Sequence, residues 1–499
     1  MNKTNTKTDI TLAAIDIGSN SFHLLIAKVD NNEMRPMLTR GERVQLAAGL
    51  KNGKLSSESM ERGFHCLAQF RQVLDSIQPD IIRVVGTNAL RAAKNAQDFV
   101  EQGSMTLGHP IQVISGREEA RLVYLGVAHT LADDQQARLV IDIGGGSTEF
   151  IIGKQFETKL LDSLHMGCVS YRDRFFSGGE ISNQQFEKAY RNAYLEVLNI
   201  RESFCAKGWS EVVGSSGSFN AIATLLNINE TSETITRDGL EHLKEKIFAI
   251  GSVDGLKTIE NLKPHRRSTL PAGLAICMAI FDALEIKQMR TSSGALREGV
   301  VYELMGRLTH EDVRERTVAA IMARYQVDQQ ATNRVEQFSN YLFRQTKDSW
   351  SLKKSDSELL NWAARLHEIG LSISHSQFHK HGQYLIDHSD LAGFSVSEQK
   401  ALGLLIRGHR RKFPSALFEG LPTKTQQPLQ RLCVLLRLAV LFKYVAPVEG
   451  TPEFKVIAKG INCTLIFQPG WLTSHPLTVA ELEEEQRYLK NAGFELLIS

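Results

Sequence analysis

The chain has 499 residues, which is too many for one ordinary hydrophobic core, so three or four domains are expected. Hydrophobic residues make up 42% and charged residues 23%, the balance of a soluble globular protein and not of a disordered one. A net charge of +2 excludes the overall basic field of a general nucleic-acid binder, so any binding of polyanions must depend on local clusters.

The cysteines and the apolar segments indicate a cytoplasmic protein. The six cysteines are scattered without a CxxC pair, which argues against a zinc site or a disulfide framework and fits a reducing compartment. The segment MNKTNTKTDI is polar, and the longest apolar stretch, residues 270–281, contains glycine and is too short to cross a membrane. The sequence leaves a peripheral membrane association open.

One phrase occurs twice in the first 300 residues. Residues 13–26 read AAIDIGSNSFHLLI, and residues 139–152 read LVIDIGGGSTEFII. Each copy predicts a β-hairpin, in which two apolar strands are joined by a turn of Gly and Ser. Two copies predict two similar α/β lobes, 1–125 and 126–308, with the two hairpin tips facing each other across a cleft.

The remaining elements follow in chain order. In the first lobe we expect helices at 56–77, 95–102 and 118–131 and strands at 81–86 and 111–114. The second lobe continues with a strand at 211–214, the turn SSGS, a helix from residue 219, an apolar helix at 270–285 and a strand at 289–291 before SSGALREG and another helix. Residues 312–448 are almost wholly helical in pattern and 454–467 alternate, which predicts a helical domain (309–448) and a small C-terminal domain (449–499).

The hairpin tips are suited to binding phosphate. Glycine lets the backbone N–H groups of a tight turn converge on an anion. The candidate residues are Ser19 and Asn20 in the first tip, Gly144, Gly145 and Ser147 in the second, and Ser215 and Gly217 in the turn before the helix at 219. A single turn of this kind is usually an ordinary hairpin, whereas a duplicated one favours anion binding.

Carboxylates stand next to both tips. Asp16 and Asp142 end apolar strands, where an ionised carboxylate needs a cation or donors, and Mg²⁺ held chiefly by Asp142 is the cation we expect. Glu149 could join the outer coordination sphere of the metal or position water, or face solvent. Glu119 opens a helix, where an acid suits the helix dipole or could orient the attacking water. Arg91 could pair with phosphate oxygens.

These motifs closely resemble the exopolyphosphatase and guanosine pentaphosphate phosphohydrolase family, over nearly the whole chain. The stretches that carry the resemblance are AAIDIGSNSFHLLIA, VVGTNALR, ISGREEARLVYLGV, LVIDIGGGSTEFIIG, MGCVSY, GSSGS, LPAGLAI and SGALREGVVYE. The resemblance implies two actin-like, Hsp70-like ATPase-superfold lobes of duplicated ribonuclease-H-like type, followed by an all-α HD-like domain and a small C-terminal α+β domain.

The resemblance also implies roles. By position, Glu119 matches the catalytic glutamate that activates or orients water, Asp142 and Glu149 match metal- and water-handling acids, and Arg91 matches a phosphate-contacting arginine. The two tips match the family's phosphate loops. Members look like homodimers whose helical domains flank a basic passage, and a monovalent cation such as K⁺ is a further candidate cofactor beside Mg²⁺.

The two branches of the family are harder to separate. The stretches FFSGGEIS, FDALEIKQMRTSSGALREGVVYE, HSDLAGF and IRGHRRKF look more like the exopolyphosphatase branch. We therefore expect hydrolysis of terminal phosphates from inorganic polyphosphate first, with hydrolysis of guanosine pentaphosphate as the alternative or as a second activity. An ATP-dependent kinase of the same superfold and a non-catalytic sensor of either polyanion are further alternatives.

The helical domain resembles an HD-type phosphohydrolase module. Its dyad is His367-Glu368 in place of His-Asp, and VEQFSNYLF offers no upstream histidine, so we expect His379, His381 and His409 to be satisfied structural residues without a metal. Basic clusters nevertheless suggest a path for a polyanion, since binding would release counterions. The path candidates are Lys380, Arg407, Arg410 and Arg411, with Arg266 and Arg267 in the second lobe.

Overall fold

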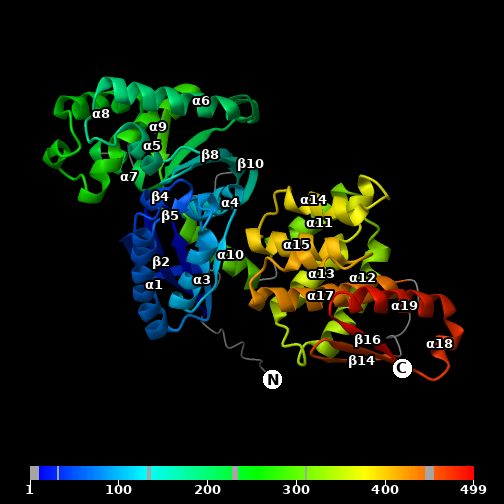
Figure 1. Cartoon of the computed structure of the whole chain (residues 1–499). Helices are drawn as coiled ribbons and strands as arrows, with labels where there is room; N and C mark the ends of the chain where they lie inside the picture. The colour runs from blue at the N-terminus through cyan, green and yellow to red at the C-terminus, as the bar shows by residue number, and fades with distance from the viewer. Residues whose placement is uncertain (1–9, 31–32, 132–135, 227–233, 309–311, 444–453) are drawn as a thin grey trace, which may run out of the picture. The chain divides into compact units, whose positions relative to one another are not determined.

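The computed structural model describes residues 10–30, 33–131, 136–226, 234–308, 312–443 and 454–499. The chain divides into two compact units, Met1–Val313 (unit 1) and Arg314–Ser499 (unit 2), which are considered separately below (Figure 1). The predicted boundaries at 308/309 and 448/449 lie outside the described residues, and the four-domain division stays a prediction.

Unit 1 contains two large sheets built on the same plan, beside a two-stranded sheet of β4 Leu50–Lys51 and β5 Lys54–Leu55. The first has the order β3-β2-β1-β6-β7, with β1 Ile10–Ile17, β2 Ser21–Asp30, β3 Glu33–Arg43, β6 Ile81–Gly86 and β7 Ile111–Val113. The second has the order β10-β9-β8-β11-β13-β12, with β8 Ala137–Ile143, β9 Thr148–Lys154, β10 Glu157–Leu164, β11 Glu211–Ser215, β12 Ile235–Thr236 and β13 Gln288–Thr291. In both, the predicted antiparallel hairpin (β1–β2, β8–β9) continues into a parallel strand (β6, β11), which confirms the duplication.

The helices of unit 1 are those predicted, with several additions. They are α1 Ser57–Ile77, α2 Asn88–Ala92, α3 Ala96–Leu107, α4 Gly116–Thr130, α5 Cys168–Phe175, α6 Asn183–Lys207, α7 Ser216–Leu225, α8 Arg237–Ile250, α9 Leu270–Ala283 and α10 Leu296–Leu308. The 25-residue helix α6 was missed, as were the outer strands β3 and β10. None of the helices in the described ranges combines the length and the hydropathy that a membrane crossing needs.

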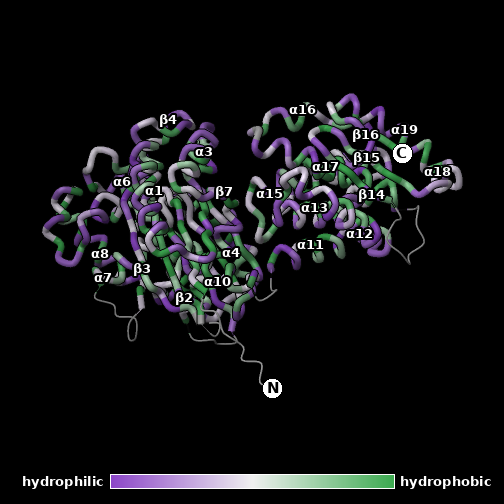
Figure 2. The backbone as a smooth tube through the Cα atoms, turned by 90° about the horizontal axis from the view of Figure 1, so that it is seen from below, coloured by the Kyte–Doolittle hydropathy of each residue, from purple (hydrophilic) through white to green (hydrophobic). Residues whose placement is uncertain are grey.

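The side chains of each central strand alternate between two cores. In β1, Ala13, Ile15 and Ile17 pack with α1 and α3, whereas Leu12 and Ala14 share a core with α4 and α10. The hydropathy colouring shows the strands as largely apolar segments beneath more polar helices (Figure 2). Asp16 continues the second set and therefore lies on the sheet face that carries α4 and α10.

Helices α4 and α10 each pack on the sheet of the other lobe. Helix α10, from the end of unit 1, packs on β1 and β2 of the first sheet, whereas α4 packs on β9 and β10 of the second. The two helices cross almost backbone to backbone, since a Cβ added to Gly299 would lie 1.8 Å from the carbonyl oxygen of Leu122. The predicted lobe boundary at 125/126 falls inside α4.

Unit 2 is mostly helical. It contains α12 Gln329–Thr346, α13 Lys354–Leu366, α14 Phe378–Asp387, α15 Val396–Gly408, α16 Ser415–Phe418, α17 Thr423–Phe442, α18 Trp471–Ser474 and α19 Pro476–Lys490, with α11 Val313–Arg324 at its start. A small sheet of order β14-β15-β16 (Phe454–Lys459, Asn462–Phe467, Glu495–Ile498) shares one hydrophobic core with these helices.

Candidate functional site

Both hairpin tips line one cavity of about 280 Å³ in unit 1. Its wall includes Ser19 and Asn20 from the first tip and Gly144, Gly145 and Ser147 from the second. The tips touch, because a Cβ added to Gly145 would lie 2.9 Å from Cβ of Ser19. The two tips therefore face each other, as the duplicated phrase predicted. Their contact leaves no space for a larger residue at position 145.

Five helices begin at this cavity. The first turn of α4 contributes Glu119, that of α10 contributes Leu296 and Arg297, and that of α7 contributes Ser216 and Gly217. The short helix α2 begins with Asn88 and α5 begins with Cys168, both in the cavity wall. Helix N-termini favour anions, since their first N–H groups lack partners within the helix. Ser216 has φ of +84°, a strained conformation that turns this backbone toward the cavity wall.

Four carboxylates come together here. Asp16, Glu119 and Asp142 line the cavity, and Glu149 lies directly opposite Asp142 across the β8–β9 hairpin. Glu149 is 1% exposed and accepts a hydrogen bond of 2.9 Å from Oγ of Ser163. Asp142 and Glu119 therefore line the same cavity, as the sequence predicted.

The four acids outnumber the arginines that line the cavity, Arg266 and Arg297. Burial and the charge of Glu119 raise the pKa of Asp142 to about 7, although the hydroxyl groups of Ser215 and Ser216 oppose the rise. Burial, and then Glu119, raise the pKa of Asp16 and of Glu149 well above the ordinary range. Oδ1 of Asp16 is buried without a hydrogen-bond partner. An arrangement of this kind fits a cation that is not part of the chain.

The donor set matches magnesium in chemistry. The cavity that Asp16 lines offers carboxylate, hydroxyl and amide oxygens, beside His23, Cys168, Arg266 and Arg297, and Mg²⁺ prefers oxygen ligands. In the described part of the chain, no three His, Cys, Asp or Glu side chains are already arranged to hold a metal ion together. Mg²⁺ is commonly held by one or two carboxylates plus substrate phosphates.

Arg91 holds Glu119 in the structure. Nη1 of Arg91 lies 2.8 Å from Oε2 of Glu119 and 3.0 Å from the carbonyl oxygen of Ile114. Oγ of Ser115 accepts from the N–H of Glu118 and so caps α4 at its first turn. Arg91 is not in the cavity wall, so its predicted contact with phosphate stays a prediction, while its contact with Glu119 was missed.

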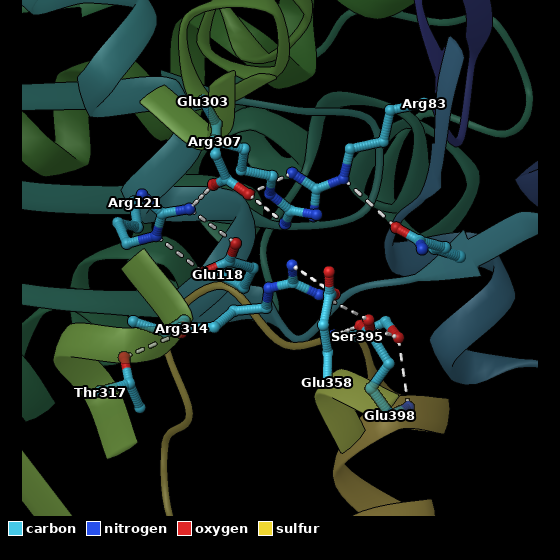
Figure 3. Close-up of polar contacts among 12 residues, drawn as sticks. Arg83, Glu118, Arg121, Glu303, Arg307, Arg314, Thr317, Glu358, Ser395 and Glu398 are labelled. Atoms are coloured by element: carbon cyan, nitrogen blue, oxygen red, sulfur yellow. Dashed lines mark hydrogen bonds and ion pairs between the residues drawn. The ribbon is translucent and has the colours of Figure 1, made fainter. Parts of the chain in front are cut away.

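A buried ion network lies beyond the first turn of α4 (Figure 3). Glu303 of α10 accepts from Arg83 of β6 at 2.5 Å, from Arg307 at 2.5 Å and from Arg121 of α4. Arg121 also forms two bonds of 2.8 Å with Glu118, the neighbour of Glu119. The network therefore ties α4, α10 and the first sheet together. In unit 2, Arg314 similarly donates to Glu358 and Glu398.

The third predicted turn contributes in part. Gly217 lines the cavity, and a Cβ there would lie 1.7 Å from Nη2 of Arg266. Ser215 is fully buried and donates to the carbonyl oxygen of Gly294, so it is the next residue, Ser216, that reaches the wall. Ser215 does not line the cavity, and its predicted contact with phosphate stays a prediction.

Several residues of the wall were missed. They are His23, Asn88, Ser216, Asn220 and Arg297, and Arg266 was assigned to a separate polyanion path. His23 could have been found, because it stands in the first hairpin where Glu149 stands in the second and lies opposite Asp16. Burial, followed by the charges of Arg297 and Arg266, lowers the pKa of His23 to about 4. The imidazole is therefore neutral near pH 7.

Four of the other path residues lie in unit 2, and Arg267 lies in unit 1. Lys380, Arg407, Arg410 and Arg411 line one cavity of about 1060 Å³, together with Lys412 and His379. Nη1 of Arg407 is buried without a partner. Arg267 lines neither this cavity nor the one at the tips, and its buried Nε has no partner.

The HD-like residues form a histidine cluster. The rings of His367 and His409 lie 5.2 Å apart, and each Nδ1 contacts a backbone carbonyl oxygen, of Ala364 at 2.7 Å and of Ile406 at 2.6 Å. Glu368 accepts from Nζ of Lys443 at 2.6 Å. The prediction of fully satisfied histidines is wrong, because Nε2 of both rings is buried without a partner. Burial lowers the pKa of His367 to about 4, so the ring stays neutral.

Comparisons with known proteins identify the family. A sequence model of the Ppx/GppA phosphatase family matches residues 25–308, and a model of Ppx/GppA phosphatase, domain III, matches residues 313–486. The chain is 40% identical over 494 residues to a protein of Vibrio vulnificus named guanosine-5'-triphosphate,3'-diphosphate pyrophosphatase, covering 97% of each chain. It is 38% identical over 489 residues to a protein of the same name from Pseudoalteromonas translucida, covering 98% of each.

Solved structures support the fold. The Aquifex aeolicus member of the Ppx/GppA family is 25% identical with a TM-score of 0.52, over 60% of this chain and 98% of that one. An exopolyphosphatase from Cytophaga hutchinsonii is 23% identical with a TM-score of 0.55, over 59% and 97%, which supports the fold alone. The predicted actin-like lobes are thereby confirmed. The chain belongs to the Ppx/GppA phosphatase family and is a phosphoanhydride-hydrolysing enzyme.

Proposed function

We propose that this protein hydrolyses the terminal 5'-phosphate of guanosine pentaphosphate (pppGpp), giving ppGpp and orthophosphate. The observation that carries the hydrolase chemistry is the meeting of both hairpin tips with Asp16, Glu119 and Asp142 at one cavity. The choice of substrate rests on the full-length relatives, which are named as pyrophosphatases of this nucleotide. It replaces polyphosphate, which the branch-like stretches had placed first.

The proposed mechanism uses the residues of this chain as follows. The N–H groups of the two tips cradle the terminal phosphate, and Glu119, held by Arg91, orients a water in line with the leaving oxygen. The water oxygen bonds to phosphorus as the bond to the bridging oxygen breaks, and Glu119 accepts the water's proton. Asp142 and Asp16 would hold Mg²⁺, which when bound neutralises charge on the phosphate oxygens.

The test of this function is a direct comparison of substrates. Purified full-length protein with Mg²⁺ receives pppGpp, long-chain polyphosphate, or ATP with a panel of sugars, and released orthophosphate is measured. We expect pppGpp to give the highest kcat/KM. A higher kcat/KM with polyphosphate would reverse the order, transfer from ATP to a sugar would indicate a kinase, and tight binding without release would indicate a sensor. The predicted homodimer and cytoplasmic location stay predictions.

Polyphosphate remains the second candidate because of one observation in unit 2. The cavity of about 1060 Å³ gathers five cationic side chains, Lys380, Arg407, Arg410, Arg411 and Lys412, against one acid, Glu419. Long anionic chains would bind such a surface with release of counterions.

Replacing Arg410 and Arg411 together by Ala tests this candidate. We expect KM for long polyphosphate to rise more than KM for tripolyphosphate, and the salt dependence of long-chain binding to flatten by about one unit of slope per arginine. The control is the double change of Arg316 and Arg324, two exposed arginines of α11 outside the cavity. Equal effects on both chain lengths would argue against a role in holding the chain.

A further inference from the structure

Arg121 of α4 stands between two buried carboxylates, those of Glu118 and Glu303 (Figure 3). Its Nε and Nη2 atoms each lie 2.8 Å from one oxygen of Glu118, and Nη2 also donates to Oε2 of Glu303. The side chains of Glu118 and Glu303 are 1% and 4% exposed. Arg121 therefore connects the first turn of α4 to the middle of α10.

Glu303 attaches this connection to the first sheet. Its Oε1 atom accepts from Arg83 of β6 and from Arg307 of α10, each at 2.5 Å. The side chain of Arg83 is 4% exposed and also donates to Gln112 of β7, at 3.2 Å. Because β6 and β7 are paired strands inside the sheet, the end of the connection opposite α4 is held by regular backbone hydrogen bonds.

The turn of α4 that Arg121 connects in this way also carries Glu119. Glu119 follows Glu118 directly in the chain and lines the catalytic cavity. The carboxylate of Glu119 has an anchor of its own, because Nη1 of Arg91 lies 2.8 Å from its Oε2. Arg91 thus orients the end of the side chain, whereas the position of its backbone depends on where the first turn of α4 is held.

Stability alone does not account for charged residues at this contact. Buried charges lose their hydration, and apolar side chains of similar size often stabilise a protein as well or better. The two helices already share an apolar core, in which Leu122 and Val123 of α4 pack with Val300 of α10. Apolar contacts have no preferred direction, whereas the forked donors of an arginine fix the carboxylates that they bind in both distance and angle. The network therefore favours a role in geometry.

We propose that Arg121 is a positioning residue for the hydrolysis: by bonding Glu118 and Glu303 at once, it fixes the place where Glu119 holds the attacking water. This inference rests on the proposed function for the role of Glu119. The water must lie in line with the leaving oxygen, and a displacement of about 1 Å can reduce the rate about 10²-fold. Arg121 is not in the cavity wall, so it acts through Glu119 and not on the phosphate.

The test is the variant R121K. Lysine keeps the charge but replaces the fork by a single ammonium group, which cannot hold two carboxylates in the same geometry. We expect kcat for phosphate release to fall about 10- to 100-fold, while KM changes by about twofold at most. The matched control is R191K on α6, where Arg191 pairs with Glu187 one turn away, and it should keep the wild-type kcat. A wild-type kcat in R121K, or a loss that appears in KM and not in kcat, would overturn the inference.

The double variant E119Q/R121K distinguishes positioning from general damage to the fold. If Arg121 acts through Glu119, adding R121K to E119Q should change single-turnover release of phosphate by about twofold at most. The same fold-loss in both backgrounds would overturn the inference, because the damage would not pass through Glu119.

The variant E118A removes the same connection and leaves the three arginines around Glu303 in place. It should reproduce the loss in kcat, also where R121K fails to fold. Thermal unfolding identifies the folded variants, and a folded E118A with the wild-type kcat counts against the inference.

Two substrates separate this inference from the proposed function. Each variant is measured with pppGpp and with tripolyphosphate. Because Glu119 acts on the water and not on the group behind the phosphate, kcat should fall by the same factor for both, and a loss confined to one of them contradicts the inference. If the wild-type protein hydrolyses tripolyphosphate alone, the proposed substrate fails and R121K still tests the positioning. If E119Q keeps the wild-type rate, the mechanism and the inference fail together.

Discussion

Replacing Glu119 by Gln lowers the rate of phosphate release by about 10²- to 10⁴-fold while substrate binding persists. The reason is that Gln keeps the shape of the side chain but cannot accept the proton of the attacking water, and proton transfer by a positioned group is worth about that factor. The bond from Arg91 to the side-chain oxygen of residue 119 can remain, so the fold is not disturbed. Single-turnover release of phosphate, measured beside the Kd, separates the two effects.

The control for this substitution is Glu101→Gln. Glu101 is an exposed acid of α3 that only accepts from Gln97, four residues earlier. Its replacement should leave kcat and thermal stability as they are. A Glu119→Gln enzyme that retains kcat within a few fold would remove the assigned mechanism, because no other carboxylate at the cavity begins a helix beside the phosphate tips.

Replacing Gly167 by Ala lowers kcat by about 10²-fold, the next largest effect we expect. An added Cβ would lie 2.4 Å from the backbone carbon and oxygen of Gly145 and from the backbone nitrogen of Gly146. Because all three atoms belong to the second tip, the tip itself must move, and a displacement of about 1 Å in a reacting group can reduce the rate about 10²-fold. Steady-state kinetics with pppGpp measure the change.

Overpacking also lowers stability, by about 1–3 kcal/mol, so unfolding must be followed in parallel. Gly178→Ala is the matched control, since a Cβ at that position meets nothing within 4 Å and the backbone has no left-handed φ. If Gly167→Ala unfolds at the wild-type temperature and turns over at the wild-type rate, the second tip is not the surface that holds the reacting phosphate.

The repeated phrase made the centre of the site predictable. Because a strand ending in Asp-Ile-Gly before a small turn has few alternatives, both hairpins, their tips and the placing of Asp16 and Asp142 followed from local pattern. The place of Glu119 in the first turn of α4 followed from local pattern, whereas its assignment as the catalytic acid rested on the family resemblance. Local pattern does not predict which distant segments of the chain come together. The partner of Arg91, the arrival of Arg297 on α10 and the presence of Ser216 instead of Ser215 in the cavity wall all depend on packing between segments that are far apart in the sequence.

The order of the two substrates could not be predicted for a related reason. The proposed binding of a terminal phosphate by the tips does not depend on what is attached to that phosphate, so the motifs that identify the chemistry are common to both branches. Selectivity between the two substrates must therefore come from residues outside the tips, which local sequence pattern does not mark. Two of the stretches that suggested polyphosphate lie in unit 1 and two in unit 2, where residues of IRGHRRKF line a separate cavity.

The exchange of α4 and α10 between the lobes has a consequence for synthesis of the chain. The first sheet is complete once residue 113 has left the ribosome, yet the apolar face that receives α10 stays uncovered until residues 296–308 emerge. During that interval Glu303, which accepts from Arg83 and Arg121 in the folded chain, has not yet been synthesised. We therefore expect the two lobes to complete their folding together, after α10 has emerged. A chaperone that shields apolar surface during those roughly 180 residues of elongation would bind the face of the first sheet that later receives α10.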